Sequence, residues 1–268
     1  TDAAHGNFDA ALGIIRAPHN GALGPRPGLS DEPEPYSSSR PEMRPYGLPL
    51  EYVPGVDEWD DLGDPANAVA MGEAMHRAAP GDVAVNLAAT SLVANRWLYD
   101  GDERSAAWLR AYVDGWRERA AVNGGLIPDS VAPDGTVGGL HDGRWFGGHY
   151  GWSWPHGLPS VGMAAVIAGI NEAFLTGDDG ALDMARVLLD TVLDNAIVAP
   201  IAETPFSLRG GWLARWGTDA ATPALLVPHR FGRLGWFDYG PMPLGLPLWV
   251  WWWSRRDVDL PRLRRAIA

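Results

Sequence analysis

The residues best suited to chemistry are concentrated in the segment Trp145–Gly157, which combines aromatic, imidazole and glycine residues. His149 and Tyr150 are of the types that transfer protons. Trp faces stack on the apolar C–H surface of sugar rings, and glycines let a loop turn tightly and present such side chains to a ligand. A single Trp here is explained as well by packing in the interior. The whole cluster predicts a site with His149 and Tyr150 as catalytic residues. Because the two long loops end at neighbouring inner helices, their ends should converge, with His149 and Tyr150 close to Trp152 or Trp154 and to Asp238.

Two carboxylates are predicted to complete that chemistry, because a glycosidase needs a pair of carboxyl groups on either side of the bond it cleaves. Asp238 lies among Trp236, Phe237 and Tyr239, where a raised pKa would suit a general acid. Asp142 lies beside Arg144 and is expected to stay ionised, so that Asp142 or a carboxylate of the N-terminal segment would act as the base. The alternative for each is a turn-forming Asp. Further carboxylates at the same rim are Asp129, Glu51, Asp57, Glu58, Asp60 and Asp61.

Arginines in the long loops indicate an acidic ligand, because guanidinium groups bind carboxylates through two parallel hydrogen bonds. They are Arg144, Arg209, Arg215, Arg230 and Arg233, with Arg40 and Arg44 in the N-terminal part. A framework of salt bridges between loops explains the same residues equally well. The predicted substrate-binding residues are Trp145, Trp152, Trp154, His156, Arg144, Arg230, Trp236, Tyr239 and Arg44.

Composition excludes several other kinds of site. The 268 residues include no Cys, and all 21 basic residues are Arg, which rules out thiolate and Schiff-base chemistry. The net charge of −12 argues against nucleic acid as a partner. His149 and His156 lack helical i, i+4 spacing and no dinucleotide fingerprint is present, so we expect no metal and no cofactor. The longest apolar stretch found, about Pro247–Trp253, is shorter than a membrane span.

The elements that must position these residues are predicted to be mainly helical. Residues 1–64 form a loop-rich N-terminal segment that contributes to the site, and residues 65–268 form the helical domain. Asp64 followed by Pro65 is a helix start. Helices are expected over about 65–78, 83–99, 103–121, 159–175, 180–198, 242–253 and 258–268. No convincing strand pattern is found.

An internal repeat supports this interpretation. A shift of 76 residues aligns Asn95 with Asn171, Gly101-Asp102 with Gly177-Asp178, and Arg110 with Arg186. A second shift places Arg186 on Arg262. Each unit reads as an apolar inner helix, a short turn and an amphipathic outer helix, while the loops at about 122–158 and 199–241 are long and lie at one rim. A helical bundle with a chance match is the alternative.

This arrangement resembles the (α/α)6-toroid carbohydrate-active enzymes over about residues 65–268. These include unsaturated glucuronyl hydrolases, other uronate-acting glycosidases and the toroid domains of alginate and heparin lyases. About seven helices are found where a full toroid has twelve. Either the toroid is incomplete, or further segments or a homo-oligomer complete it, or the fold is smaller than the resemblance implies. The run Trp249–Trp253 is expected to line the barrel, and in an incomplete toroid it would be exposed and need a partner.

The resemblance and the rim residues together leave three functions open. The first is a glycoside hydrolase that cleaves beside a uronic acid in an oligosaccharide or polysaccharide. The second is a polysaccharide lyase in which Arg or His neutralises the uronate and His149 or Tyr150 removes its C5 proton. The third is a glycan-binding scaffold without activity. The cellular compartment stays open.

Overall fold

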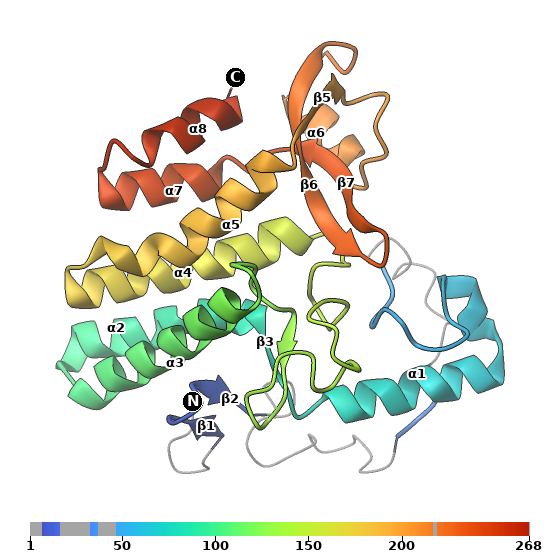
Figure 1. Ribbon diagram of the computed structural model, residues 1–268, viewed down its shortest axis with the longest axis horizontal. Helices are drawn as coiled ribbons and strands as arrows, with labels where there is room; N and C mark the ends of the chain where they lie inside the picture. Colours follow the sequence, from blue (N-terminus) through green and yellow to red (C-terminus); the bar gives the residue numbers. More distant parts are fainter. Residues whose placement is uncertain (1–6, 17–32, 37–46, 217–218, 268) are drawn as a thin grey trace.

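Three helical hairpins form the body of the protein. The computed structural model describes residues 7–16, 33–36, 47–216 and 219–267. The hairpins are α2 (Thr90–Asp100) with α3 (Glu103–Val122), α4 (Gly157–Thr176) with α5 (Asp183–Asp194), and α7 (Gly245–Ser254) with α8 (Leu260–Ile267). They are stacked in chain order, with the α4–α5 pair in the middle (Figure 1). The mainly helical prediction is confirmed.

Short turns close the first two hairpins, as the sequence predicts. Gly101 and Gly177 end the inner helices α2 and α4 in the left-handed conformation, which glycine adopts without a steric penalty. The side chains of Asp102 and Asp178 then accept hydrogen bonds from backbone amides two residues later. The second turn continues into a 3-10 helix, η4 (Asp179–Leu182), before α5 begins.

Helix α4 is the centre of the main core. It is apolar on nearly every side, and its neighbours α2, α3, α5 and α7 cover it. Among the described residues it is the one helix long and apolar enough to cross a membrane, and half of its most apolar window is buried in the protein. Buried core helices meet the same criterion. The sequence predicts this apolar inner helix over about 159–175, although the apolar stretch named above as the longest is Pro247–Trp253.

Helix α1 (Pro65–Ala78) begins as predicted, with the Asp64 carboxylate accepting the Ala66 amide at 2.8 Å and Pro65 at the first helical position. It follows the 3-10 helix η2 (Trp59–Gly63) and packs on the preceding loop in a second, smaller core. This core consists of Leu50, Val53, Val56, Leu62 and Met71. The predicted boundary at residue 64 therefore runs through one packed unit.

A three-stranded antiparallel sheet was not predicted, and the expectation of a long loop over 199–241 is wrong. Its order is β5 (Ile197–Pro200), β6 (Pro223–Gly232) and β7 (Gly235–Pro241), with α6 (Arg209–Trp216) between β5 and β6. Strands β6 and β7 form a hairpin with a two-residue loop between Gly232 and Gly235. Pro228 within β6 obscures the strand pattern, since proline normally marks an edge or a break.

Short strands tie the remaining segments to the helices. The first pair is β1 (Phe8–Asp9) with β2 (Ile14–Ile15), and the second is β3 (Asp82–Val83) with β4 (Ser130–Val131). The 3-10 helix η3 (Ala84–Ala89) leads from β3 into α2, where the sequence predicts one continuous helix. The α-helix of this segment therefore begins at Thr90, later than the predicted start at residue 83.

The recurring arginine does not occupy equivalent environments. Arg110 is exposed on α3, whereas Arg186 on α5 is almost fully buried and binds Asp259 through two hydrogen bonds. Helix η4 places Arg186 one turn into α5, while Arg110 lies two turns into α3. The repeat predicts the hairpins correctly, but the two arginines that it aligns differ in burial and in partners.

The tryptophan-rich run of α7 does not line an enclosed interior. Leu246 and Val250 are buried against the core, but Trp249, Trp252 and Trp253 are each more than 40% exposed. The α7–α8 hairpin lies at one end of the stack, next to α4 and α5 (Figure 1). The prediction that the run faces a barrel is therefore wrong for the hairpin stack described here.

Candidate functional site

One buried carboxylate organises the glycine-rich loop. Asp129 is 1% exposed and accepts backbone hydrogen bonds from Gly148 at 2.9 Å, Trp152 at 2.6 Å and Gly147. Burial raises its pKa to about 7, although the three N–H donors act in the opposite direction. A Cβ on Gly151 would lie 2.1 Å from the Asp129 carboxyl carbon. The glycines therefore serve the folding of the loop around Asp129.

The aromatic residues of this loop join it to the β6–β7 hairpin. Trp152 is fully buried, its Nε1 donates to the Ile127 carbonyl at 2.8 Å, and its ring meets that of Trp236 edge to face. Trp145 and Trp236 both pack against Phe231. The prediction that Trp152 stacks on a sugar is wrong, because no face of its ring reaches solvent. Trp145 and Trp236 belong to the same group of packed rings between the loop and the hairpin.

Backbone contacts complete the junction of the two segments. The Arg230 guanidinium donates to the Ser153 carbonyl, and the Phe231 amide donates to the Trp152 carbonyl at 3.1 Å. The predicted convergence of the glycine-rich loop and the segment that contains the β6–β7 hairpin is confirmed.

His149 and Tyr150 form an aromatic trio with Trp154. The His149 ring centroid lies 4.2 Å from that of Tyr150 and 5.4 Å from that of Trp154. Tyr150 is 45% exposed, whereas Trp154 is buried. His149 also lines a cavity of about 210 Å³ between α1 and the loop. The predicted neighbourhood of His149, Tyr150 and Trp154 is confirmed.

A cluster of cationic and aromatic side chains lies where the N-terminal segment meets the loop and the hairpin turn. We call it the Arg–Glu51 cluster, and its members are Glu51, Tyr52, Arg144, Arg230 and Arg233. Glu51 is anchored by its amide, which donates to the Gly147 carbonyl at 3.0 Å. Guanidinium carbons of Arg144 and Arg233 lie 4.5 Å and 5.6 Å from the Tyr52 ring centroid. Three cations therefore surround one carboxyl group and one phenol.

The electrostatics of the cluster are those of a partly buried site. Burial raises the pKa of Glu51, and the charges of Arg230, Arg233 and Arg144 oppose this rise. Burial and the neighbouring Glu51 raise the pKa of Tyr52 to about 12. Burial lowers the pKa of Arg230. Three buried atoms have no hydrogen-bond partner: Glu51 Oε2, Tyr52 Oη and Arg144 Nε. Such atoms are costly to bury unless a ligand completes their hydrogen bonds.

Asp238 lies in β7 with a positive backbone φ of 61°. Its negative charge raises the pKa of Arg230, against the lowering by burial. The Asp238 carboxylate accepts hydrogen bonds from the Ser207 amide at 2.6 Å and the Ser207 hydroxyl at 2.5 Å. Its predicted approach to His149 stays a prediction.

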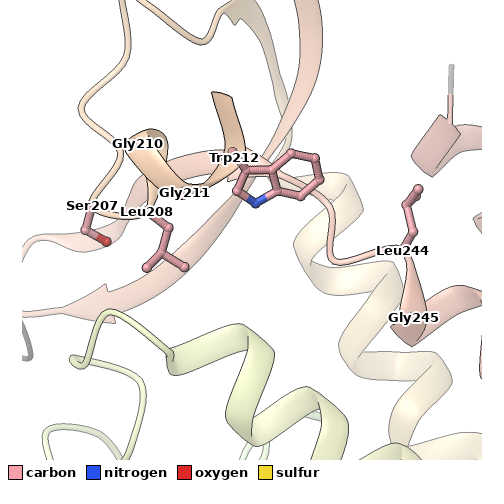
Figure 2. A pocket seen from close by; sticks show the side chains of 7 residues that line it. All are labelled: Ser207, Leu208, Gly210, Gly211, Trp212, Leu244 and Gly245. Carbon is pink, nitrogen blue, oxygen red and sulfur yellow. The ribbon is translucent and has the colours of Figure 1, made fainter. Parts of the chain in front are cut away.

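Ser207 connects Asp238 to a larger pocket of about 690 Å³ beside α6. Figure 2 shows Ser207 and Leu208 at one end of this pocket, Leu244 and Gly245 at the other, and the Trp212 ring between them. Its other lining residues are Gly210, Gly211 and Gly245. The pocket offers an aromatic ring and a hydroxyl, whereas the charged groups gather at the Arg–Glu51 cluster.

The remaining candidates are dispersed. Asp142 has 88% of its side chain exposed and pairs with Arg144 at 3.1 Å, so it shares no partner with Asp238. The predicted pairing of these two carboxylates across one bond stays a prediction. His156 caps α4, and Tyr239 pairs with Pro228 in the hairpin. Arg44 lies outside the described residues, and Trp216 and Arg215 have no described side chains.

Sequence reasoning offered Glu51 only within a group of N-terminal carboxylates, and Arg233 only among the loop arginines expected to bind an acidic ligand. It missed Tyr52, Ser207 and Trp212 entirely. No local signal marks Tyr52, although its backbone φ of 66° sets it apart in the structure. Among the described residues, no group of three or more His, Asp or Glu side chains is arranged to hold a metal ion.

The family model described as a domain of unknown function (DUF8034) matches residues 1–268, and the chain belongs to this family. No curated protein and no solved structure matches the chain.

Proposed function

We propose that the protein acts on a uronic-acid-containing glycan at the Arg–Glu51 cluster, by β-elimination. The observation that carries the proposal is a single carboxyl group and a phenol, both with unpartnered oxygens, among three guanidinium groups. Elimination needs a cation for the uronate carboxylate, one base and one proton donor, which is the set of groups in this cluster. The stacked hairpins support a partial α/α toroid as its scaffold.

The arginines would recognise the sugar carboxylate. Arg144 and Arg233 are partly exposed and lie on the Tyr52 ring, so a carboxylate placed there could displace their pairing with Asp142 and Asp57. Bidentate contacts to a carboxylate withdraw charge from the sugar ring and acidify the C5 proton. Arg230 is held by Ser153 and fixes the position of this binding surface.

Glu51 and Tyr52 would then share the proton transfers. The Glu51 carboxylate takes the C5 proton, and the electron pair of that bond forms the C4–C5 double bond as the C4–O bond breaks. Tyr52, whose raised pKa keeps the phenol protonated, gives its proton to the leaving oxygen. Transfer of the proton from Glu51 to the phenolate restores both groups.

Hydrolysis at the same cluster is a second candidate. Asp57 binds the Arg233 guanidinium and supplies a second carboxylate near Glu51. With Glu51 as acid and Asp57 as base, the cluster would contain the pair that glycosidases use. Hydrolysis yields a reducing sugar without a new double bond, so the two reactions have different products.

The test is turnover of a panel of uronate oligosaccharides, followed by ultraviolet absorbance of the unsaturated product and by reducing-end release. We expect absorbance to rise, and both Glu51→Gln and Tyr52→Phe to reduce turnover by about 10²-fold or more. Glu73→Gln, an exposed carboxylate on α1, is the control and should keep full activity. Reducing ends without absorbance would indicate hydrolysis, and binding without turnover would indicate a scaffold.

A further inference from the structure

We propose that the cavity between α1 and the glycine-rich loop is a separate binding site for a small uncharged phenol-type molecule. The cavity has a volume of about 210 Å³ and does not include any member of the Arg–Glu51 cluster. Its lining residues are Leu50, Met75, Ala78, Ala79, Val83, Ser130, His141 and His149.

The walls and size of the cavity select a compact, mainly apolar ligand. Leu50, Ala78, Ala79 and Val83 present hydrocarbon surface, and Met75 adds a thioether, which adapts its shape and makes favourable contacts with aromatic rings. A cavity of about 150 Å³ is known to admit benzene, so this volume accommodates one substituted ring. It is below the roughly 300 Å³ at which pockets for larger molecules begin.

The polar residues that line the cavity, His141 and Ser130, favour a ligand with one hydrogen-bonding group. His141 is 7% exposed, and its Nε2 atom is buried without a hydrogen-bond partner. Leaving such an atom unpaired is unfavourable, and a ligand hydroxyl beside it would remove that penalty. Ser130, itself 5% exposed, lies on the same side of the cavity.

The ligand should be uncharged. Burial lowers the pKa of His141, and the positive charge of Arg144 lowers it further, which keeps the imidazole neutral. None of the lining residues carries a formal charge when both imidazoles are neutral. An ionised ligand would therefore lose its hydration without gaining an ion pair with the cavity wall.

An aromatic body fits the surroundings better than an aliphatic one. His149 lines the cavity and belongs to the aromatic trio with Tyr150 and Trp154, whose ring centroids lie 4.2–5.4 Å apart. A ring in the cavity can extend this set of edge-to-face contacts, each worth more than its buried area alone. These features together favour a phenol over an aliphatic alcohol.

The test is binding of phenol to the full chain, measured by amide NMR shifts and thermal unfolding, in comparison with toluene, cyclohexanol and benzoate. We expect saturable phenol binding with shifts at Ser130 and His141, and weaker binding of the other three. His141→Phe should weaken phenol binding about tenfold while leaving toluene binding intact, which also shows that the variant is folded. Ala78→Leu should block both ligands by filling the cavity.

His76→Phe, which replaces an exposed imidazole on the same helix, is the matched control and should bind phenol like the parent chain. The proposal is overturned if phenol shows no saturable binding, if benzoate binds more tightly than phenol, or if His141→Phe leaves phenol binding unchanged. Because Glu51→Gln and Tyr52→Phe do not alter this cavity, loss of the proposed lyase activity would leave the phenol result untouched.

Discussion

At the scale of single residues, buried charges do much to hold the hairpins together. Arg186 binds Asp259 through Nε at 2.9 Å and Nη2 at 2.8 Å, and Asp259 is fully buried. Arg262 also binds Asp259 and reaches Asp190 on α5. These contacts join the middle hairpin to the last one. Helix α8 has no fully buried residue, so its hydrophobic packing alone would hold it only weakly.

Arg186→Ala should therefore destabilise the protein by about 3 kcal/mol, because it leaves the buried Asp259 carboxylate with fewer partners. Arg110→Ala, at the position that the repeat aligns with Arg186, should change stability by no more than about 0.5 kcal/mol, since Arg110 is exposed. Urea unfolding of both variants measures the difference. Equal losses would contradict the assignment of Arg186 as the main tie.

Two buried carboxyl groups predict the pH dependence of stability. Burial raises the pKa of Asp129 to about 7 and that of Asp82 to about 6, from an ordinary value near 3.8. Between about pH 4 and pH 7 these two groups bind more protons in the folded protein than in the unfolded chain, so their contribution to stability falls as pH rises. His141 and His229, whose pKa burial lowers from the ordinary value of 6.5, act in the opposite direction below that value. Carboxylates with lowered pKa, such as Asp259 and Asp179, act in the opposite direction below about pH 4.

We accordingly expect the free energy of unfolding to decrease from pH 5 to pH 8. Urea titrations at one-unit intervals check this, and Asp82→Asn should flatten the part of the curve near pH 6. A free energy of unfolding that rises steadily through this interval would show that the hydrogen bonds to these carboxylates outweigh their burial.

At the scale of elements, signals that are local in the sequence predicted the helices well. Asp64-Pro65, Gly101-Asp102 and Gly177-Asp178 mark real helix ends, because capping depends on residues within one turn. The β6–β7 hairpin has no such signal. Pro228 interrupts its pattern, and its partner segments are the glycine-rich loop and the N-terminal segment, both distant in sequence.

The candidate site was predictable only in part for the same reason. The aromatic content of Trp145–Gly157 is visible in the sequence, but whether Trp152 faces a ligand or the core depends on packing against Trp236. The contact of Glu51 with the Arg233 amide joins residues 182 positions apart. No spacing rule covers such a pair.

The glycine-rich loop gives a prediction about its own geometry. Gly151→Ala should destabilise the protein by roughly 2–4 kcal/mol, because its Cβ would overlap the Asp129 carboxyl group that the loop is folded around. Gly210→Ala is the matched control, since no atom lies within 4 Å of the added Cβ and Ala favours the helix α6. Thermal unfolding compares the two, and a stable Gly151→Ala variant would show that Asp129 is not the organising group.

At the scale of the whole molecule, the three hairpins form a stack whose last member is chemically unlike the rest of the chain. The net charge is −12, yet the α7–α8 end carries a concentration of arginines, namely Arg255, Arg256, Arg262, Arg264 and Arg265. Apolar rings are exposed on the same hairpin. Three of these arginines pair with aspartates of the middle hairpin: Arg256 with Asp179, Arg262 with Asp190 and Arg265 with Asp194. The arginines of the last hairpin therefore fasten it to its acidic neighbour.

The uneven burial of tryptophan also divides the intrinsic fluorescence of the protein into two optical populations. Trp116 and Trp152 are fully buried and should emit at shorter wavelengths, whereas Trp249, Trp252 and Trp253 are open to a quencher in solution. The Arg255 guanidinium, 3.7 Å above the Trp252 ring, should favour iodide over neutral acrylamide as a quencher at that end. Quenching by iodide would thus act most strongly on the exposed rings of α7, while the protected emission reports on the folded core.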